Sequence, residues 1–172
     1  MAVYALGDLV PVIADTAYVH PDATVIGSVT IGEYSSIWPA TVLRGDYGEI
    51  SVGDRTSVQD GTVIHATHDL ATRIGSDCVI GHNAHLEGCT IEDKALVGSG
   101  SIVLHRAVVR SGGLVGAGAV VAGGTEVPSG AMALGIPAKI RPDAVTPEMI
   151  QLAVDVYVEN ARRYPKELRR LD

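Results

Sequence analysis

The chain has 172 residues, a length typical of a single domain with a sizeable core. Hydrophobic residues make up 47% of it, yet it contains no Phe and one Trp, so we expect a core of aliphatic side chains. The formal net charge of -7 and the absence of a Lys/Arg cluster argue against nucleic acid as a partner.

The N-terminal stretch MAVYALGDLV lacks the basic segment and the long apolar run that mark a secretory signal. No apolar run elsewhere is long enough to cross a membrane. We therefore expect a cytoplasmic protein with no membrane partner, in which Cys78 and Cys89 are reduced and buried.

From residue 13 the chain divides into hexads such as VHPDAT, VIGSVT and VGAGAV. The first position of each hexad is aliphatic, as in Val25, Ile64, Ile80 and Val109, and the fifth position is small. A period of six fits neither a helix nor a simple alternating strand. It predicts an all-β solenoid in which each coil has three flat faces and the aliphatic residues point inward.

The repeat is interrupted at three places. The stretches LRGDYGEI (43–50) and HATHDLATR (65–73) insert residues, and LEGCT (86–90) is one residue short. Because insertions in a solenoid emerge as loops, often on the functional face, we expect loops at the two longer stretches.

After Pro142 the hexad pattern gives way to a helical one. Thr146 is a plausible N-cap, and Pro147 suits the first helical position. We therefore expect a solenoid over residues 1–142 and, within 143–172, a helix that packs on the prism or on a neighbouring subunit. The expected apolar stripe of this helix consists of Met149, Ile150, Ala153, Val154, Tyr157, Val158 and Ala161.

Histidines can be placed on this scaffold. His65 follows inward Ile64, while His85 and Glu87 flank inward Leu86, so all three should point outward. His65 lies seventeen residues before His82, close to the eighteen of one regular coil. We therefore expect these two imidazoles on one face, one coil apart.

Outward imidazoles at this spacing, with a carboxylate or a third imidazole, suit Zn, Fe or Co with an open position for water. The alternative is that they are merely solvated. Arg44, Asp46, Gln59 and Asp60 fall near His65 in the predicted coils and could orient a metal-bound water. The alternative for Arg44 is a structural salt bridge to an Asp, including one across a subunit boundary.

The prism, RGD at 44–46, VQDGTVIH at 58–65, IGH at 80–82 and the terminal helix together resemble the gamma-class carbonic anhydrase family over nearly the whole chain. The resemblance implies a left-handed parallel β-helix and a homotrimer. It also implies a metal at each subunit interface, held by two histidines of one subunit and one of the next.

Carried over onto this chain, the family's first two ligands are His65 and His82. The third position, five residues after the second, holds Glu87, and His85 lies two residues before it. We expect His85 to be the third ligand rather than Glu87, because a carboxylate would lower the Lewis acidity of the metal.

The resemblance implies metal-dependent hydration of carbon dioxide to bicarbonate, with Zn as the metal and Fe or Co as alternatives. Gln59, Asp60, Arg44 and Asp46 match the family's interface and active-site polar residues, and Gln59 would orient the hydroxide or the product. Two other functions are open. One is a hexapeptide-repeat acyltransferase that uses coenzyme A or acyl carrier protein, and the other is a noncatalytic protein of the siderophore-binding (ferripyochelin-binding) type.

Overall fold

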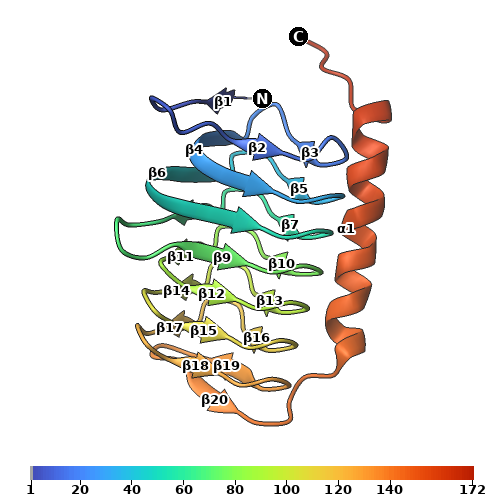
Figure 1. Ribbon diagram of the computed structural model, residues 1–172. Coiled ribbons are helices and arrows are strands. Elements are labelled where there is room, and N and C mark those ends of the chain that lie inside the picture. The colour runs from blue at the N-terminus through green and yellow to red at the C-terminus, as the bar shows by residue number, and fades with distance from the viewer. Residues whose placement is uncertain (1) are drawn as a thin grey trace.

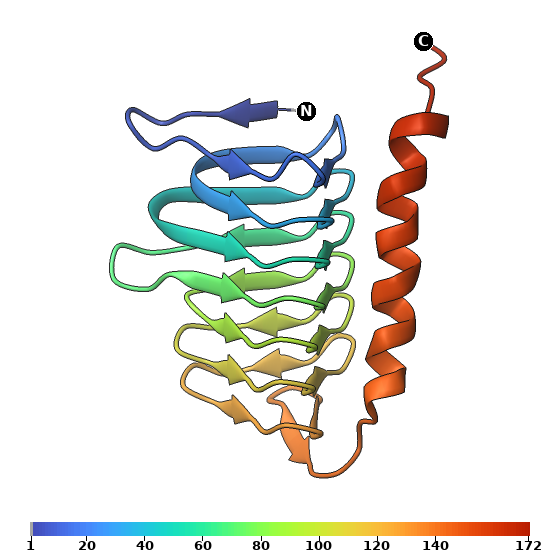
Figure 2. The same ribbon diagram turned by 45° about the vertical axis from the view of Figure 1, so that its right-hand side comes forward.

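The computed structural model describes residues 2–172 and has the predicted solenoid architecture. The chain winds into a left-handed parallel β-helix whose coils stack along one axis, and a single long helix runs beside the stack (Figures 1 and 2). Among the described residues, no helix is long and apolar enough to span a membrane.

Each coil contributes short strands to three faces. The first face consists of β1 (Ala2–Tyr4), the first part of β4 (Thr24–Ile31), the first part of β6 (Val42–Val52), β8 (Val63–His65), β11 (His85–Glu87), β14 (Ile102–Val103) and β17 (Val120–Val121). The second face consists of β2 (Val12–Ile13), the later parts of β4 and β6, β9 (Thr72–Ile74), β12 (Thr90–Ile91), β15 (Val108–Val109) and β18 (Glu126–Val127).

The third face forms a separate sheet. It consists of β3 (Tyr18–Val19), β5 (Ser36–Ile37), β7 (Ser57–Val58), β10 (Val79–Ile80), β13 (Leu96–Val97), β16 (Leu114–Val115), β19 (Met132–Leu134) and β20 (Lys139–Arg141). The strands of this sheet pair in parallel until β20, which runs antiparallel to β19 and ends the solenoid.

The core lies inside the prism, as the hexad pattern predicts. Val25, Ile64, Ile80 and Val109 are fully buried, each stacked on its equivalent in the next coil. Burying one such side chain contributes about 1.5–3 kcal/mol, so the stability is shared among many small increments. Cys78 and Cys89 are free thiols within this core, as expected, and burial raises the pKa of each to about 12.

The two insertions have different outcomes. Residues 66–71 form the expected loop between β8 and β9, closed by backbone hydrogen bonds between Thr67 and Leu70. The insertion at 43–50 lies within β6, but it leaves the ladder for four residues. Gly45 pairs with Gly27 and Ile50 with Val29, so residues 46–49 bulge outward between the first and second faces, and Tyr47 is exposed.

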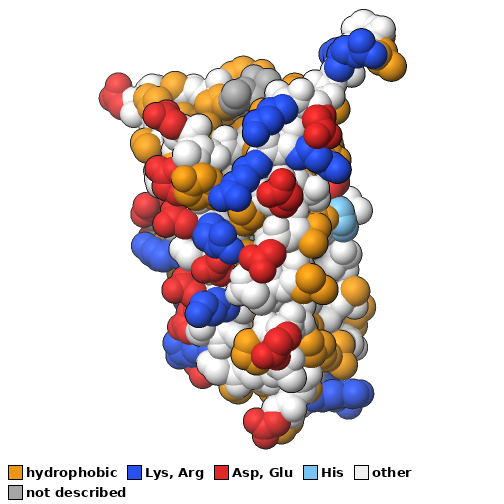
Figure 3. All heavy atoms as spheres, turned by 90° about the vertical axis from the view of Figure 1, so that its right-hand side faces the viewer, with side chains coloured by type: hydrophobic (Ala, Val, Ile, Leu, Met, Phe, Trp, Pro, Cys, Tyr) orange, Lys and Arg blue, Asp and Glu red, His pale blue; other side chains and the backbone are white. Residues whose placement is uncertain are grey.

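The helix α1 (Pro147–Glu167) covers the third face and begins at the predicted position after Thr146. Its stripe of Ile150, Val154, Val158 and Ala161 is buried against the prism. Met149 was expected in that stripe, but its position on the helix turns it away from the sheet and leaves it half exposed. Figure 3 shows this side of the molecule, where charged and apolar side chains alternate over the helix.

Candidate functional site

The first face is not covered by α1 and carries a column of polar side chains. Arg44 of β6 lies beside His65 of β8, and His65 lies beside Glu87 of β11. Strand alternation turns all three side chains outward, because their neighbours Leu43, Ile64 and Leu86 point into the core. The predicted outward orientation of His65 and Glu87 is confirmed.

His65 is hydrogen-bonded at both ring nitrogens. Its Nδ1 lies 2.9 Å from Glu87 Oε1, and its Nε2 lies 2.9 Å from Asp46 Oδ1. Arg44 pairs with the other oxygen of Asp46, so the structural salt bridge considered for Arg44 is present within one chain.

These contacts stabilise both carboxylates in the charged form. The hydrogen bond from His65 holds the pKa of Glu87 below its ordinary value, against partial burial. For Asp46, burial raises the pKa, but the hydrogen bonds from His65 and Arg44 outweigh it and the net pKa is lowered.

His82 lies elsewhere, and its expected position one coil from His65 is wrong. The loop 66–71 lengthens this coil, so the residue stacked on His65 is Glu87, twenty-two positions later. His82 follows β10, at the corner where the third face meets the first, and its coil neighbour is Asp60. The Nδ1 of His82 lies 2.9 Å from Asp60 Oδ2, and both side chains are half exposed.

The strand register distinguishes the two candidates for a third ligand. Glu87 is the residue beside His65, whereas His85 is beside Val63. The imidazole of His85 approaches Glu87 instead, with its Nε2 3.4 Å from Oε2. The register therefore favours Glu87 over His85 as the residue that would bind the same metal ion as His65.

Gln59 follows β7, directly before Asp60, and is 5% exposed. Its backbone is part of the coil, because its N–H donates to the carbonyl of Ile80 and its carbonyl accepts the hydroxyl of Thr41. Gln59 and Asp60 thus lie on the His82 side of the candidate site, while Arg44 and Asp46 lie on the His65 side.

One residue near this cluster was missed by the sequence analysis. The Nε2 of His105 lies 3.7 Å from Glu87 Oε1. The signal in the sequence was the short coil at LEGCT: Leu86 pairs with Val103, so Leu104 stacks beside Glu87 and His105 lies one position further, next to it.

The donor set fits a metal only if two chains share it. Within residues 2–172, no three His, Cys, Asp or Glu side chains are arranged around a common point. His65 and Glu87 form an adjacent pair on one face, and His82 presents an Nε2 without a hydrogen-bond partner among the described residues. A pair and a single ligand at opposite edges of one face would complete a metal site only between two copies of the chain.

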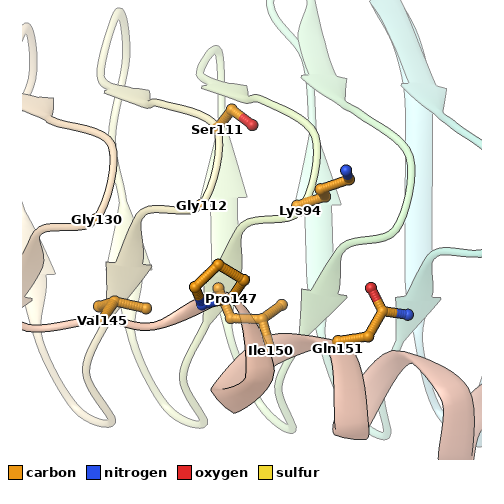
Figure 4. Close-up of a pocket in the computed structure, with 8 residues that line it drawn as sticks. All are labelled: Lys94, Ser111, Gly112, Gly130, Val145, Pro147, Ile150 and Gln151. Carbon is orange, nitrogen blue, oxygen red and sulfur yellow. The ribbon is translucent and has the colours of Figure 1, made fainter.

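A separate cavity of about 320 Å³ lies beneath the first turn of α1 (Figure 4). Its lining includes Lys94, Ser111, Val145, Pro147, Ile150 and Gln151. None of Asp46, Asp60, His65, His82 and Glu87 lines it, so this cavity is not part of the candidate site.

The protein families and solved structures that this chain resembles are hexapeptide-repeat proteins. Residues 71–105 match the family model described as bacterial transferase hexapeptide (six repeats). The crystal structure of a hexapeptide transferase family protein from Anaplasma phagocytophilum superposes with a TM-score of 0.90 at 36% identity, covering 95% of this chain and 98% of that one.

Two curated relatives match over shorter segments. Gamma carbonic anhydrase 2, mitochondrial, of Arabidopsis thaliana is 45% identical over 103 residues, which are 56% of this chain and 37% of that protein. Carnitine operon protein CaiE of Escherichia coli O157:H7 is 43% identical over 104 residues, which are 60% of this chain and 53% of CaiE. The match therefore spans about half, or less, of the length of these relatives.

Proposed function

The chain belongs to the hexapeptide transferase family, and from this premise we propose that it hydrates carbon dioxide at a metal site shared between two protomers of a homotrimer. The proposed ligands are His65 and Glu87 of one protomer and His82 of the next, with Zn as the metal and Fe or Co as alternatives. Similarity to a plant gamma carbonic anhydrase supports this choice of reaction.

The observation that carries the proposal is the contact between His82 and Asp60. A carboxylate that accepts the Nδ1 proton of an imidazole fixes the tautomer and leaves Nε2 as a ligand nitrogen. Histidines that bind metals commonly have such a partner, whereas a solvated surface histidine has no need of one.

The remaining side chains suit this reaction. A bound metal supplies a water whose pKa is lowered to about 7, which can attack the carbon of carbon dioxide. Asp46 can release His65 Nε2 to a metal without losing a cationic partner, because Arg44 pairs with it. Gln59, beside Asp60, offers an amide to orient the water or the bicarbonate.

The uncovered first face is the surface proposed for trimer contacts. Its outward positions are aliphatic around the polar column, and Val63 is 39% exposed. The other outward aliphatic side chains of this face are Ile26, Val42, Ile102, Leu104 and Val120. An apolar face with charges near its centre is typical of a contact between subunits.

The proposal is tested by metal analysis and stopped-flow hydration assays on wild type and His82→Ala. We expect loss of the interface metal and of hydration in His82→Ala, and wild-type behaviour in His20→Ala. His20 is the control, because its imidazole lies 3.8 Å from the carboxylate of Asp22 at the same corner of the prism, three coils away from His82. Equal hydration rates in wild type and His82→Ala would contradict the proposal.

Mixed trimers test the shared site directly. His65→Ala and His82→Ala should each be inactive alone. Trimers reassembled from equal amounts of both variants should regain activity at about a quarter of the interfaces, because random assembly there unites both intact ligands. Mixed trimers that remain inactive would show that the two histidines do not serve one site.

A transferase is the second candidate function, favoured by the family description and by the Anaplasma relative. In that case a histidine acts as general base toward an acyl thioester. Saturable turnover of acetyl-coenzyme A, lost in His65→Ala and unaffected by metal removal, would favour this function over hydration.

A further inference from the structure

The cavity beneath the first turn of α1 lies where side chains are missing along one corner of the prism. At the corner between the second and third faces, each of six coils places one residue at a positive φ. These corner residues are, in chain order, Tyr34, Arg55, Asp77, Lys94, Gly112 and Gly130. The first four carry side chains, whereas the last two carry none. The cavity of about 320 Å³ is lined by Lys94 and by the two glycines (Figure 4).

Further along this corner, side chains bridge the space between the prism and α1. The Cζ of Arg162 lies 5.3 Å from the ring centroid of Tyr34, and Arg55 bonds to Asp155 at 3.0 Å. At Gly112 no such bridge exists, since a Cβ built there would have nothing within 4 Å. The space between the corner and the start of the helix is therefore left open.

The lining of the cavity combines an apolar wall with a cation. Val145, Pro147 and Ile150 come from the segment that leads into α1 and from its first turn, while Lys94 and Ser111 belong to the prism (Figure 4). Among the lining residues within 2–172, Lys94 is the only one with a charge, and none is an Asp or a Glu. The cavity thus favours a ligand with one negative group and an apolar body.

Lys94 is available to such a ligand, because it has no ion pair among the described residues. The carboxylates of the neighbouring coils are already engaged: Asp77 pairs with Arg55 at 2.7 Å, and Glu92 pairs with Arg110 at 2.7 Å. The side chain of Lys94 is exposed. Its flexible four-carbon stem lets the ammonium group turn toward a bound anion.

We propose that this cavity binds a small carboxylic acid with a short apolar chain. The carboxylate accepts hydrogen bonds from the ammonium of Lys94 and the hydroxyl of Ser111. The chain packs against the apolar wall of the cavity, whose volume is in the usual range for a small-molecule site. This site shares no residue with the proposed hydration site and does not depend on it.

The test is calorimetric titration of hexanoate into the full-length protein at constant ionic strength, with hexanol as the uncharged comparison. Lys94→Gln removes the charge. Gly112→Asn places a side chain in the cavity at a φ that Asn tolerates, as Asn83 does elsewhere in the chain. Lys166→Gln is the matched control, because it removes the same charge from an exposed lysine in the last turn of α1. Size-exclusion chromatography and thermal unfolding check that each variant is folded.

We expect hexanoate to bind wild type and Lys166→Gln with equal affinity, and more tightly than hexanol does. Lys94→Gln should weaken binding about tenfold, because a charged hydrogen-bond donor is lost. Gly112→Asn should abolish binding. An absence of binding to wild type, equal affinities for hexanol and hexanoate, or unchanged affinity in either folded cavity variant would overturn the inference.

A last variant separates this site from the proposed metal. His82→Ala should bind hexanoate as wild type does, because His82 does not line the cavity. Loss of hexanoate binding in His82→Ala would also overturn the inference, since the carboxylate would then be bound at the interface metal. Retained binding in a His82→Ala protein that also keeps its hydration activity would support the inference while contradicting the proposed function.

Discussion

At the residue scale, the candidate site consists of imidazoles whose neighbours are carboxylates. Asp60 contacts His82, and Asp46 and Glu87 contact His65. Such partners decide which nitrogen is available and how the ring is oriented. In the proposed site, Asp60 and Asp46 act on the histidines without binding the metal, whereas Glu87 is itself a proposed ligand. Variants of the carboxylates are therefore as informative as variants of the histidines.

Replacing Asp60 by Asn should weaken zinc binding at the proposed interface site about 10–100-fold, because the His82 ring loses its fixed tautomer and its orientation. The measurement is competition with a chromophoric chelator. Asp22→Asn is the matched control, because Asp22 contacts His20 outside the site, and it should leave the affinity unchanged. Equal affinities in both variants would contradict the assigned role of Asp60.

The lowered pKa of Glu87, caused first by its hydrogen bond from His65, predicts an acid-sensitive contribution to stability. This contribution is complete above the ordinary glutamate pKa of about 4.3 and is lost as the pH falls through the lower folded-state value. In metal-free protein, the urea midpoint of Glu87→Gln should therefore fall less between about pH 6 and pH 3 than that of wild type. Parallel pH profiles in the two proteins would contradict the prediction.

At the scale of elements, α1 stabilises the third face by burying one stripe of its surface. Ile150 and Val154 are almost completely buried against Val79, and Arg55 ties the helix to the turns through Asp155 at 3.0 Å. The helix start after Thr146 and most of the stripe were predictable, because Pro147 at the first helical position and the helical period are local signals, although the Thr146 side chain makes no capping hydrogen bond. The exposure of Met149 was not, since it depends on how the helix is rotated on the sheet.

Two neighbouring helix residues provide a stability test of this packing. Ile150 is 2% exposed and Leu152 is 72% exposed. Ile150→Ala should lower the free energy of unfolding by about 2–5 kcal/mol, because it leaves a cavity against the sheet. Leu152→Ala should change it by no more than about 0.5 kcal/mol. Urea unfolding measures both values, and similar losses would show that the packing described for α1 is incorrect.

At the scale of the whole molecule, the hexad period was enough to predict the solenoid and its inward residues. The same period misplaced His82, because a constant coil length was applied across the loop 66–71. Which residues of two successive coils pair depends on how many residues between them form loops outside the strands. Hydrogen bonding between the coils decides that number, and the sequence period alone does not show it. The same count applies to β6, where residues 46–49 bulge out between the paired residues Gly45 and Ile50.

The proposed assembly is tested by a charge on the first face. Val63→Glu should convert trimers to monomers and abolish hydration, because it places a carboxylate in an apolar contact. Val12→Glu is the control, since Val12 is 63% exposed on the second face and should tolerate the change. Light scattering gives the mass of each variant, and trimeric Val63→Glu would argue for a different contact surface.

The antiparallel pairing of β20 with β19 has a consequence for solubility at high concentration. A stack of parallel strands presents at its end a template on which another stack can continue, as in fibre growth. A last strand that runs in the opposite direction does not match the parallel coils of a second molecule. The reversal of three residues near the C-terminus therefore ends the parallel stacking on the third face and disfavours the addition of a second solenoid there.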